Sequence, residues 1–135
     1  MNKSSLTTVL VKKAFEEEFA EIRHKFEVFE LSVSEAATCS EPYVANPGVY
    51  IFWHSERGVI KVGRHLTNSR KRALEHIKDN TGGTMAELRN DQKAKLILFN
   101  LKDSKSKHWA AALEIFFEVY LSEIGALEIK AGRLG

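Results

Sequence analysis

Four side chains that exchange protons or carry positive charge fall within residues 47–77. They are Tyr50, Lys61, Arg72 and His76. A phenol and an imidazole can take up and release protons, whereas ammonium and guanidinium groups neutralise anions. The segment therefore predicts proton transfer beside a negatively charged ligand, provided that the fold brings these side chains together.

Positive charge is concentrated in the middle of the chain. The 135 residues carry a net charge of +2, but residues 46–109 carry a net +7, against −3 in residues 1–45 and −2 in residues 110–135. A basic face on a nearly neutral domain is suited to a polyanion such as nucleic acid, while a solvated charged surface is the commoner meaning of such a bias. The charge pattern leaves both interpretations open.

The composition is that of a single globular domain. Hydrophobic residues make up 44% and charged residues 28% of the chain, close to the average for soluble domains. Cys39 has no second cysteine to pair with, which favours a reducing compartment. No apolar run reaches the roughly 18 residues needed to cross a bilayer, and the N-terminus lacks the pattern of a signal peptide. We therefore expect a cytoplasmic protein that does not enter a membrane.

The elements that must position these side chains follow from periodicity and turn signals. Apolar spacing of three and four predicts helices at residues 5–26, 68–80 and 106–124, with a shorter one at 84–92. β-Branched and aromatic runs predict strands at 27–33, 48–54, 58–63 and 95–101, and residues 34–48 are expected to form a loop. The helix at 68–80 is expected to begin at Thr67 or Asn68 and to end at the glycines of TGGT.

We expect an α/β (α+β) fold with a small, mainly antiparallel, three-stranded central sheet flanked by helices and an added N-terminal helix. The chain is taken as one domain. Within it, residues 1–45 form an N-terminal helix and strand extension, residues 46–125 form the core, and residues 126–135 form a tail or an edge strand.

The strands at 48–54 and 58–63 are expected to form a β-hairpin. If residues 55–58 make the turn, His54 faces Val59, Phe52 faces Lys61 and Tyr50 faces Gly63, and a bulge would alter this pairing. This register places Tyr50 and Lys61 on one face as diagonal neighbours. Arg72 and His76, four residues apart, share one side of the following helix.

The hairpin, the basic helix and the last helix together resemble the GIY-YIG nucleases. Gly48-Val49-Tyr50 resembles the GIY motif, and Lys61-Val62-Gly63 resembles YIG with lysine in place of the tyrosine, as in some restriction-endonuclease members. Arg72 and His76 resemble the arginine and the frequent histidine of the family. Glu114, within AALEIFFEVYL, resembles its metal-binding glutamate. The resemblance covers roughly residues 47–125, although the asparagine that many members carry after this glutamate is missing.

The resemblance implies a metal-dependent DNA endonuclease. Tyr50 is expected to take a proton from the attacking water, with the ammonium group of Lys61 favouring the phenolate. Arg72 is expected to neutralise charge on the phosphate, and His76 to position the phosphate or the water. Glu114 is expected to hold one divalent cation, Mg²⁺ or Mn²⁺, with Glu118 as the alternative ligand.

The resemblance implies duplex DNA as the partner, and four further residues are candidates for contacts to it: Arg64, His65, Arg70 and Lys71. Specificity would then come from loops, from a partner protein or from a second subunit, and two cuts in a duplex would favour a homodimer. No membrane contact is expected.

Each candidate also has a plainer explanation. Tyr50 could pack in the core, the arginines could form a solvated helix face, His76 could be structural, and Glu114 could continue a solvent-facing polar stripe. Two other classes of protein therefore compete with the nuclease. One is a nucleic-acid-binding module that has the fold without cleavage, and the other is an α/β domain unrelated to nucleic acid.

Overall fold

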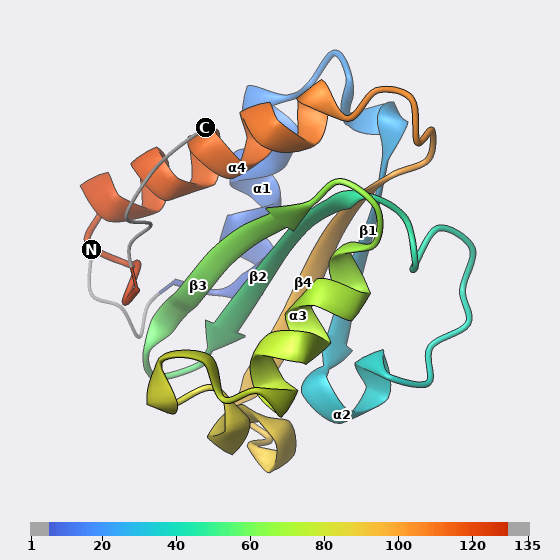
Figure 1. The fold of residues 1–135 in the computed structure, drawn as a ribbon. Helices are drawn as coiled ribbons and strands as arrows, with labels where there is room; N and C mark the ends of the chain where they lie inside the picture. Colours follow the sequence, from blue (N-terminus) through green and yellow to red (C-terminus); the bar gives the residue numbers. More distant parts are fainter. Residues whose placement is uncertain (1–5, 130–135) are drawn as a thin grey trace.

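The computed structural model describes residues 6–129, and its centre is one antiparallel sheet with the strand order β1-β4-β2-β3 (Figure 1). The strands and α-helices within these residues are as follows: β1 Phe26–Ser32, β2 Gly48–His54, β3 Gly58–His65 and β4 Ala94–Leu101, with α1 Thr8–Glu18, α2 Val33–Ala36, α3 Ser69–Lys78 and α4 His108–Glu123. The expected mixed α/β class is confirmed.

The sheet has four strands rather than three. The segment that we assigned to the N-terminal extension forms β1, which pairs with β4 from Phe26 opposite Leu101 to Ser32 opposite Lys95. The strand joins the sheet because β4 is apolar on both faces and needs a neighbour along each of its edges.

The two faces of the sheet carry separate apolar clusters. α1 and α4 cover one face, where Phe15 meets Phe99 at 5.1 Å between ring centroids and Phe99 meets Phe117 at the same distance. α2 and α3 cover the other face, which includes Tyr50 and Phe52. We refer to these as the α4 face and the α3 face.

Several helix boundaries differ from those we expected. α1 ends before Phe19, and the chain turns through a 3₁₀ turn, Arg23–Lys25, so that Phe26 can enter β1 while its ring still packs on Phe15. The expected loop begins with the short helix α2, because Ser32 and Glu35 form a reciprocal capping box. α3 begins after Asn68, as expected, but its left-handed terminal residue is Asn80 rather than a glycine.

The hairpin confirms the pairing of Tyr50 with Gly63 and of Phe52 with Lys61. A register shift after Phe52 then pairs His54 with Gly58, so the expected contact with Val59 was wrong. The shift places an extra residue in β3, which is the usual consequence of a β-bulge. Because the irregularity lies on the turn side, the register around Tyr50 is unaffected.

The described end of the chain lies along β3. Residues 126–129 run beside it through one parallel bridge between Val59 and Leu127, and Ile129 donates to Ile60 O at 2.9 Å. The expected edge strand at 126–135 is therefore reduced to this bridge within the described part, and residues 130–135 lie outside the described residues. None of the helices between residues 6 and 129 has the length and apolar character needed to cross a membrane.

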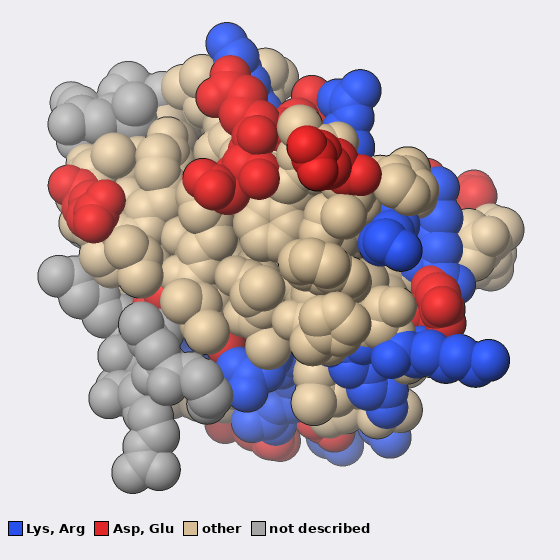
Figure 2. Space-filling model, turned by 90° about the horizontal axis from the view of Figure 1, so that it is seen from above, with Lys and Arg blue, Asp and Glu red and all other residues tan. Residues whose placement is uncertain are grey.

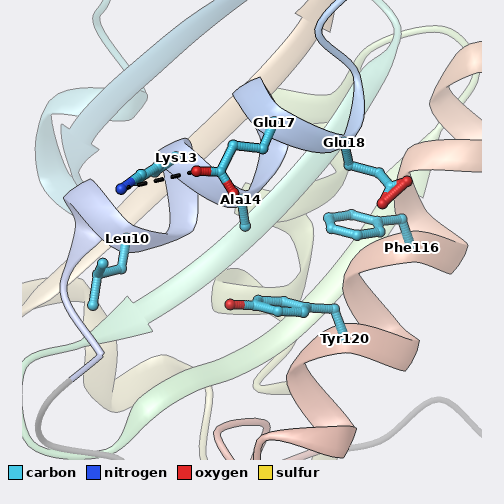
Figure 3. A pocket seen from close by; sticks show the side chains of 7 residues that line it. All are labelled: Leu10, Lys13, Ala14, Glu17, Glu18, Phe116 and Tyr120. Atoms are coloured by element: carbon cyan, nitrogen blue, oxygen red, sulfur yellow. Dashed lines mark ion pairs between the residues drawn. The ribbon is translucent and has the colours of Figure 1, made fainter.

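α4 leaves part of its apolar surface uncovered. Ile115 is 36% and Val119 42% exposed, and Figure 2 shows a broad uncharged surface on this side with charged groups mainly at its margins. Between α1 and α4 lies an open groove in which Phe116 and Tyr120 stack at an interplanar angle of 10° (Figure 3).

Candidate functional site

The ring of Tyr50 lies against the backbone of its strand partner. A Cβ atom at Gly63 would lie 2.2 Å from both Cζ and Oη of Tyr50, much closer than carbon and oxygen atoms can approach. Glycine is therefore required at position 63 if the ring is to keep this position. The contact joins the GVY and KVG segments into a single structural unit.

The hydroxyl of Tyr50 forms a buried hydrogen bond with a histidine. Oη lies 2.8 Å from Nε2 of His76, and Nδ1 of the same ring lies 2.9 Å from Oγ1 of Thr81. Tyr50 is 3% and His76 5% exposed. We call these three residues the Tyr50–His76–Thr81 chain.

Both titratable members of this chain are neutral at pH 7. Burial raises the pKa of Tyr50 to about 12, although the charge and hydrogen bonding of Arg72 oppose the rise; Glu114 adds to it. Burial, together with the nearby charges of Arg72 and Lys61, lowers the pKa of His76 to about 4. A neutral imidazole donates through one nitrogen and accepts through the other, so both hydrogen bonds can form at once.

The first turn of α3 is fixed to the sheet by a buried amide. Asn100 of β4 accepts a hydrogen bond from Ser69 and donates to the carbonyls of Tyr43 and Val44 at 2.9 and 3.0 Å. The backbone of β4 also approaches β2 closely here, because a Cβ at Gly48 would lie 2.4 Å from the carbonyl oxygen of Phe99. This network orients α3, which in turn positions Arg72 and His76.

The basic residues of α3 lie in different environments. The positive charge of Arg72 acts on Tyr50 and favours a lower pKa of its phenol. Arg72 also forms an ion pair with Glu75 at 3.3 Å. Arg70 instead donates to the carbonyls of Ala36 and Cys39, and so ties α3 to the end of α2. Lys71 is exposed. The structure thus gives Arg70 a structural contact, while the roles of Arg70 and Lys71 in DNA binding stay predictions.

Lys61 acts on His76. It lies on the α3 face opposite Phe52, half-buried, and its charge helps to lower the pKa of His76. Among the charges that act on Tyr50, Arg72 is the one that favours the phenolate. Because burial outweighs this charge, Tyr50 keeps its proton at neutral pH.

Glu114 reaches the site from the opposite face of the sheet. Its side chain is 14% exposed and forms an ion pair with Arg64 of β3, which is 26% exposed. Glu114 therefore does not belong to a solvent-facing polar stripe. Its negative charge helps to raise the pKa of Tyr50. Glu118, one turn later, is 4% exposed and also buried.

A divalent cation at Glu114 stays a prediction, and it would have a single protein ligand. Within residues 6–129, no cluster of three or more His, Cys, Asp or Glu side chains could hold a metal ion. Mg²⁺ often binds through one or two carboxylates and completes its coordination with water and substrate phosphate. Glu114 can supply one such carboxylate once Arg64 releases it.

Beside this ion pair lies an open depression of about 430 Å³, lined by Arg64, His65, Leu66, Thr67 and Glu114. Nδ1 of His65 accepts the backbone N–H groups of Thr67 and Asn68 at 3.2 and 3.0 Å. A neutral His65 therefore carries its proton on Nε2, which can donate to an anion. Three of the predicted site residues, Arg64, His65 and Glu114, thus line the same depression.

Three polar residues at or near the site were missed in the sequence. Thr81 lies three residues after the end of α3, and its position five residues after His76 is the only signal for it. Asn100 is an amide within an apolar strand, a pattern that indicates a buried polar network. His54, at the hairpin end of β2, is buried, and its Nε2 lies 2.9 Å from Oδ2 of Asp91.

Comparison of the chain with protein-family models, with curated proteins and with solved structures gave no match.

Proposed function

We propose that this protein is a divalent-cation-dependent endonuclease that hydrolyses phosphodiester bonds in DNA. The observation that carries the proposal is the 2.8 Å contact between Tyr50 Oη and His76 Nε2, within electrostatic reach of Arg72, Lys61 and Glu114. Proton acceptors, phosphate-binding cations and a carboxylate are the groups that phosphodiester hydrolysis requires.

The proton of the attacking water passes to Tyr50 in this proposal. A phenol with a pKa of about 12 is a poor source of free phenolate at neutral pH. His76 resolves this difficulty, because its Nε2 accepts the phenolic proton as Oη takes a proton from the water. Tyr50 therefore never has to carry a full negative charge in its buried position.

Binding of the phosphate strengthens this proton acceptor. In the free protein, Arg72 and Lys61 lower the pKa of His76. A DNA phosphate beside these two cations neutralises them, so the pKa of His76 rises toward its ordinary value. Arg72 also stabilises the charge that develops on the phosphoryl oxygens, a task suited to its planar, permanently charged group.

Glu114 would hold Mg²⁺ or Mn²⁺ in place of its ion pair with Arg64, which would leave Arg64 available to a neighbouring phosphate. When bound, such a cation stabilises negative charge on the phosphate and on the departing 3′ oxygen. His65, whose Nε2 can donate, and Lys71 extend the contact to the DNA backbone.

A plasmid-nicking assay tests the proposal. We expect the protein to nick or linearise supercoiled plasmid with Mg²⁺ or Mn²⁺ and to be inactive with EDTA, and we expect purified Tyr50→Phe to cut far more slowly, by a factor of about 10² to 10⁴. Tyr43→Phe is the matched control, because Tyr43 is 41% exposed and lies outside the proposed chemistry. DNA binding without cleavage under every metal condition would instead support the binding module with the same fold.

A further inference from the structure

The turn after α3 supplies a hydroxyl to the imidazole that contacts Tyr50. Thr81 Oγ1 lies 2.9 Å from Nδ1 of His76, on the side of the ring opposite Tyr50. Thr81 lies outside the motifs that predict the nuclease. It has no contact with Tyr50, Arg72 or Glu114 among its hydrogen bonds in the described residues, so any effect on them passes through His76.

The turn fixes the position of this hydroxyl. Asn80 adopts a left-handed conformation with φ 50°, its carbonyl accepts the N–H of Gly83 at 2.8 Å, and its side chain accepts the N–H of Ala86 at 2.9 Å. Gly82, at φ 75°, continues the turn in a conformation that favours glycine. The backbone conformations of Asn80 and Gly82, on either side of Thr81, therefore determine where Thr81 lies.

The two hydroxyls that contact His76 differ in acidity. A phenol is a much stronger acid than an aliphatic alcohol, so it is the better hydrogen-bond donor and the poorer acceptor. The favoured arrangement has Tyr50 donating to Nε2 and Thr81 accepting from Nδ1–H. The reverse tautomer would place a proton on Nε2, where it would block transfer from Tyr50.

We propose that Thr81 is a positioning residue that keeps the proton of neutral His76 on Nδ1 and so leaves Nε2 open toward Tyr50. The consequence for cleavage rests on the proposed nuclease function, but the tautomer itself does not. The charged groups near His76 are Lys61 from β3, Arg72 and Glu75 from α3, and Asp79, which directly follows α3; the Thr81 substitutions leave all four in place.

The tautomer can be measured without any substrate. In protein labelled with ¹⁵N-histidine at pH 7.5, where His76 is neutral, we expect the NMR shifts of this ring to report a protonated Nδ1 and an unprotonated Nε2. Thr81→Val, which keeps the shape and removes the hydroxyl, should give a mixture of tautomers or the reverse one. Thr81→Ser should restore the wild-type pattern.

Cleavage provides the second measurement. Thr81→Val should lower the cleavage rate about tenfold, the effect of losing one ordinary hydrogen bond in the reacting arrangement, while Thr81→Ser stays close to wild type. Thr84→Val is the matched control, since Thr84 is exposed in the same part of the chain. Circular dichroism and thermal unfolding check that each variant is folded.

The outcomes separate this inference from the nuclease proposal. Protonated Nε2 in the wild type, or an unchanged tautomer in folded Thr81→Val, overturns the role of Thr81 even if the protein cuts DNA. A wild-type Nδ1–H tautomer that is lost in Thr81→Val supports the positioning role even if no cleavage is found, and then only the nuclease proposal fails.

Discussion

The two faces of the sheet contribute different kinds of polar group to the candidate site. On the α3 face, Tyr50 and His76 are almost fully buried and neutral, and hydrogen bonds join them to Thr81. On the α4 face, Glu114 and Arg64 are charged and partly exposed to solvent. A buried neutral pair such as Tyr50 and His76 is costly to rearrange, whereas a partly solvated ion pair exchanges partners readily. The proposed proton transfer is thus assigned to the α3 face, whose polar groups are held rigidly. The proposed cation is assigned to the α4 face, where the carboxylate can exchange its partner.

The largest effect is expected on the α4 face. Glu114→Ala should abolish metal-dependent cleavage, because it removes the only proposed protein ligand, while DNA binding is largely retained. Loss of the ion pair should cost about 1–3 kcal/mol of folding free energy. Plasmid nicking and a DNA mobility-shift assay measure the two functions, and chemical denaturation measures stability.

Arg64→Gln is the companion to this variant. It frees Glu114 without removing it, so we expect tighter Mn²⁺ binding than in the wild type, measured by electron paramagnetic resonance in the absence of DNA. Full cleavage by Glu114→Ala would contradict the division between the faces and would direct attention to Glu118.

On the α3 face, Tyr50→Phe should reduce cleavage by a factor of about 10² to 10⁴, the usual contribution of a general base. Here the loss should come with a measurable loss of stability, about 1–3 kcal/mol, because Nε2 of buried His76 is left without its partner. Single-turnover kinetics and urea denaturation measure the two quantities. Cleavage by Tyr50→Phe close to the wild-type rate would remove the tyrosine from the mechanism.

Gly63→Ala should disturb the α3 face without removing any polar group. The new methyl group would overlap the ring of Tyr50, so the ring must move away from His76, with an expected cost of about 1–3 kcal/mol and a parallel fall in cleavage. In a Tyr50→Val background the same substitution should cost much less, because the ring is gone. An equal cost in both backgrounds would show that the overlap is not what requires glycine.

The smallest effect concerns pH. The pKa of His76 in the folded protein, about 4, lies below the ordinary value of 6.5, so the unfolded chain binds more protons between these values. Stability from this residue is therefore complete above pH 6.5 and is lost as the pH falls toward 4. We expect His76→Gln to flatten the decline of unfolding free energy over this range. His24→Gln, at an exposed position, should leave it unchanged.

The sequence predicted the parts of this structure that depend on local pattern. Alternation and turn chemistry placed β2, β3 and β4, and the two-residue period correctly paired Tyr50 with Gly63. Because register follows from side-chain alternation, the neighbours of the tyrosine on its own face could be anticipated.

Contacts between distant segments could not be predicted in this way. No local pattern pairs Arg64 with Glu114, which are 50 residues apart and belong to β3 and α4. Nor did it indicate that burial would raise the pKa of Tyr50, since burial depends on how α3 packs over the sheet. The β-bulge that shifts His54 was also undetermined, because turn type decides it locally.

The contact between Gly63 and the ring of Tyr50 also affects how the motif should be read in other sequences. A pattern search scores the tyrosine of GVY and the glycine of KVG as independent letters, but in this fold they occupy one shared volume. A chain that had lost the aromatic ring would be free to accept alanine or serine at position 63. Finding both residues together therefore counts as less evidence than two independent matches would. It does indicate that the aromatic ring has been retained. In an alignment of relatives, these two columns should vary together.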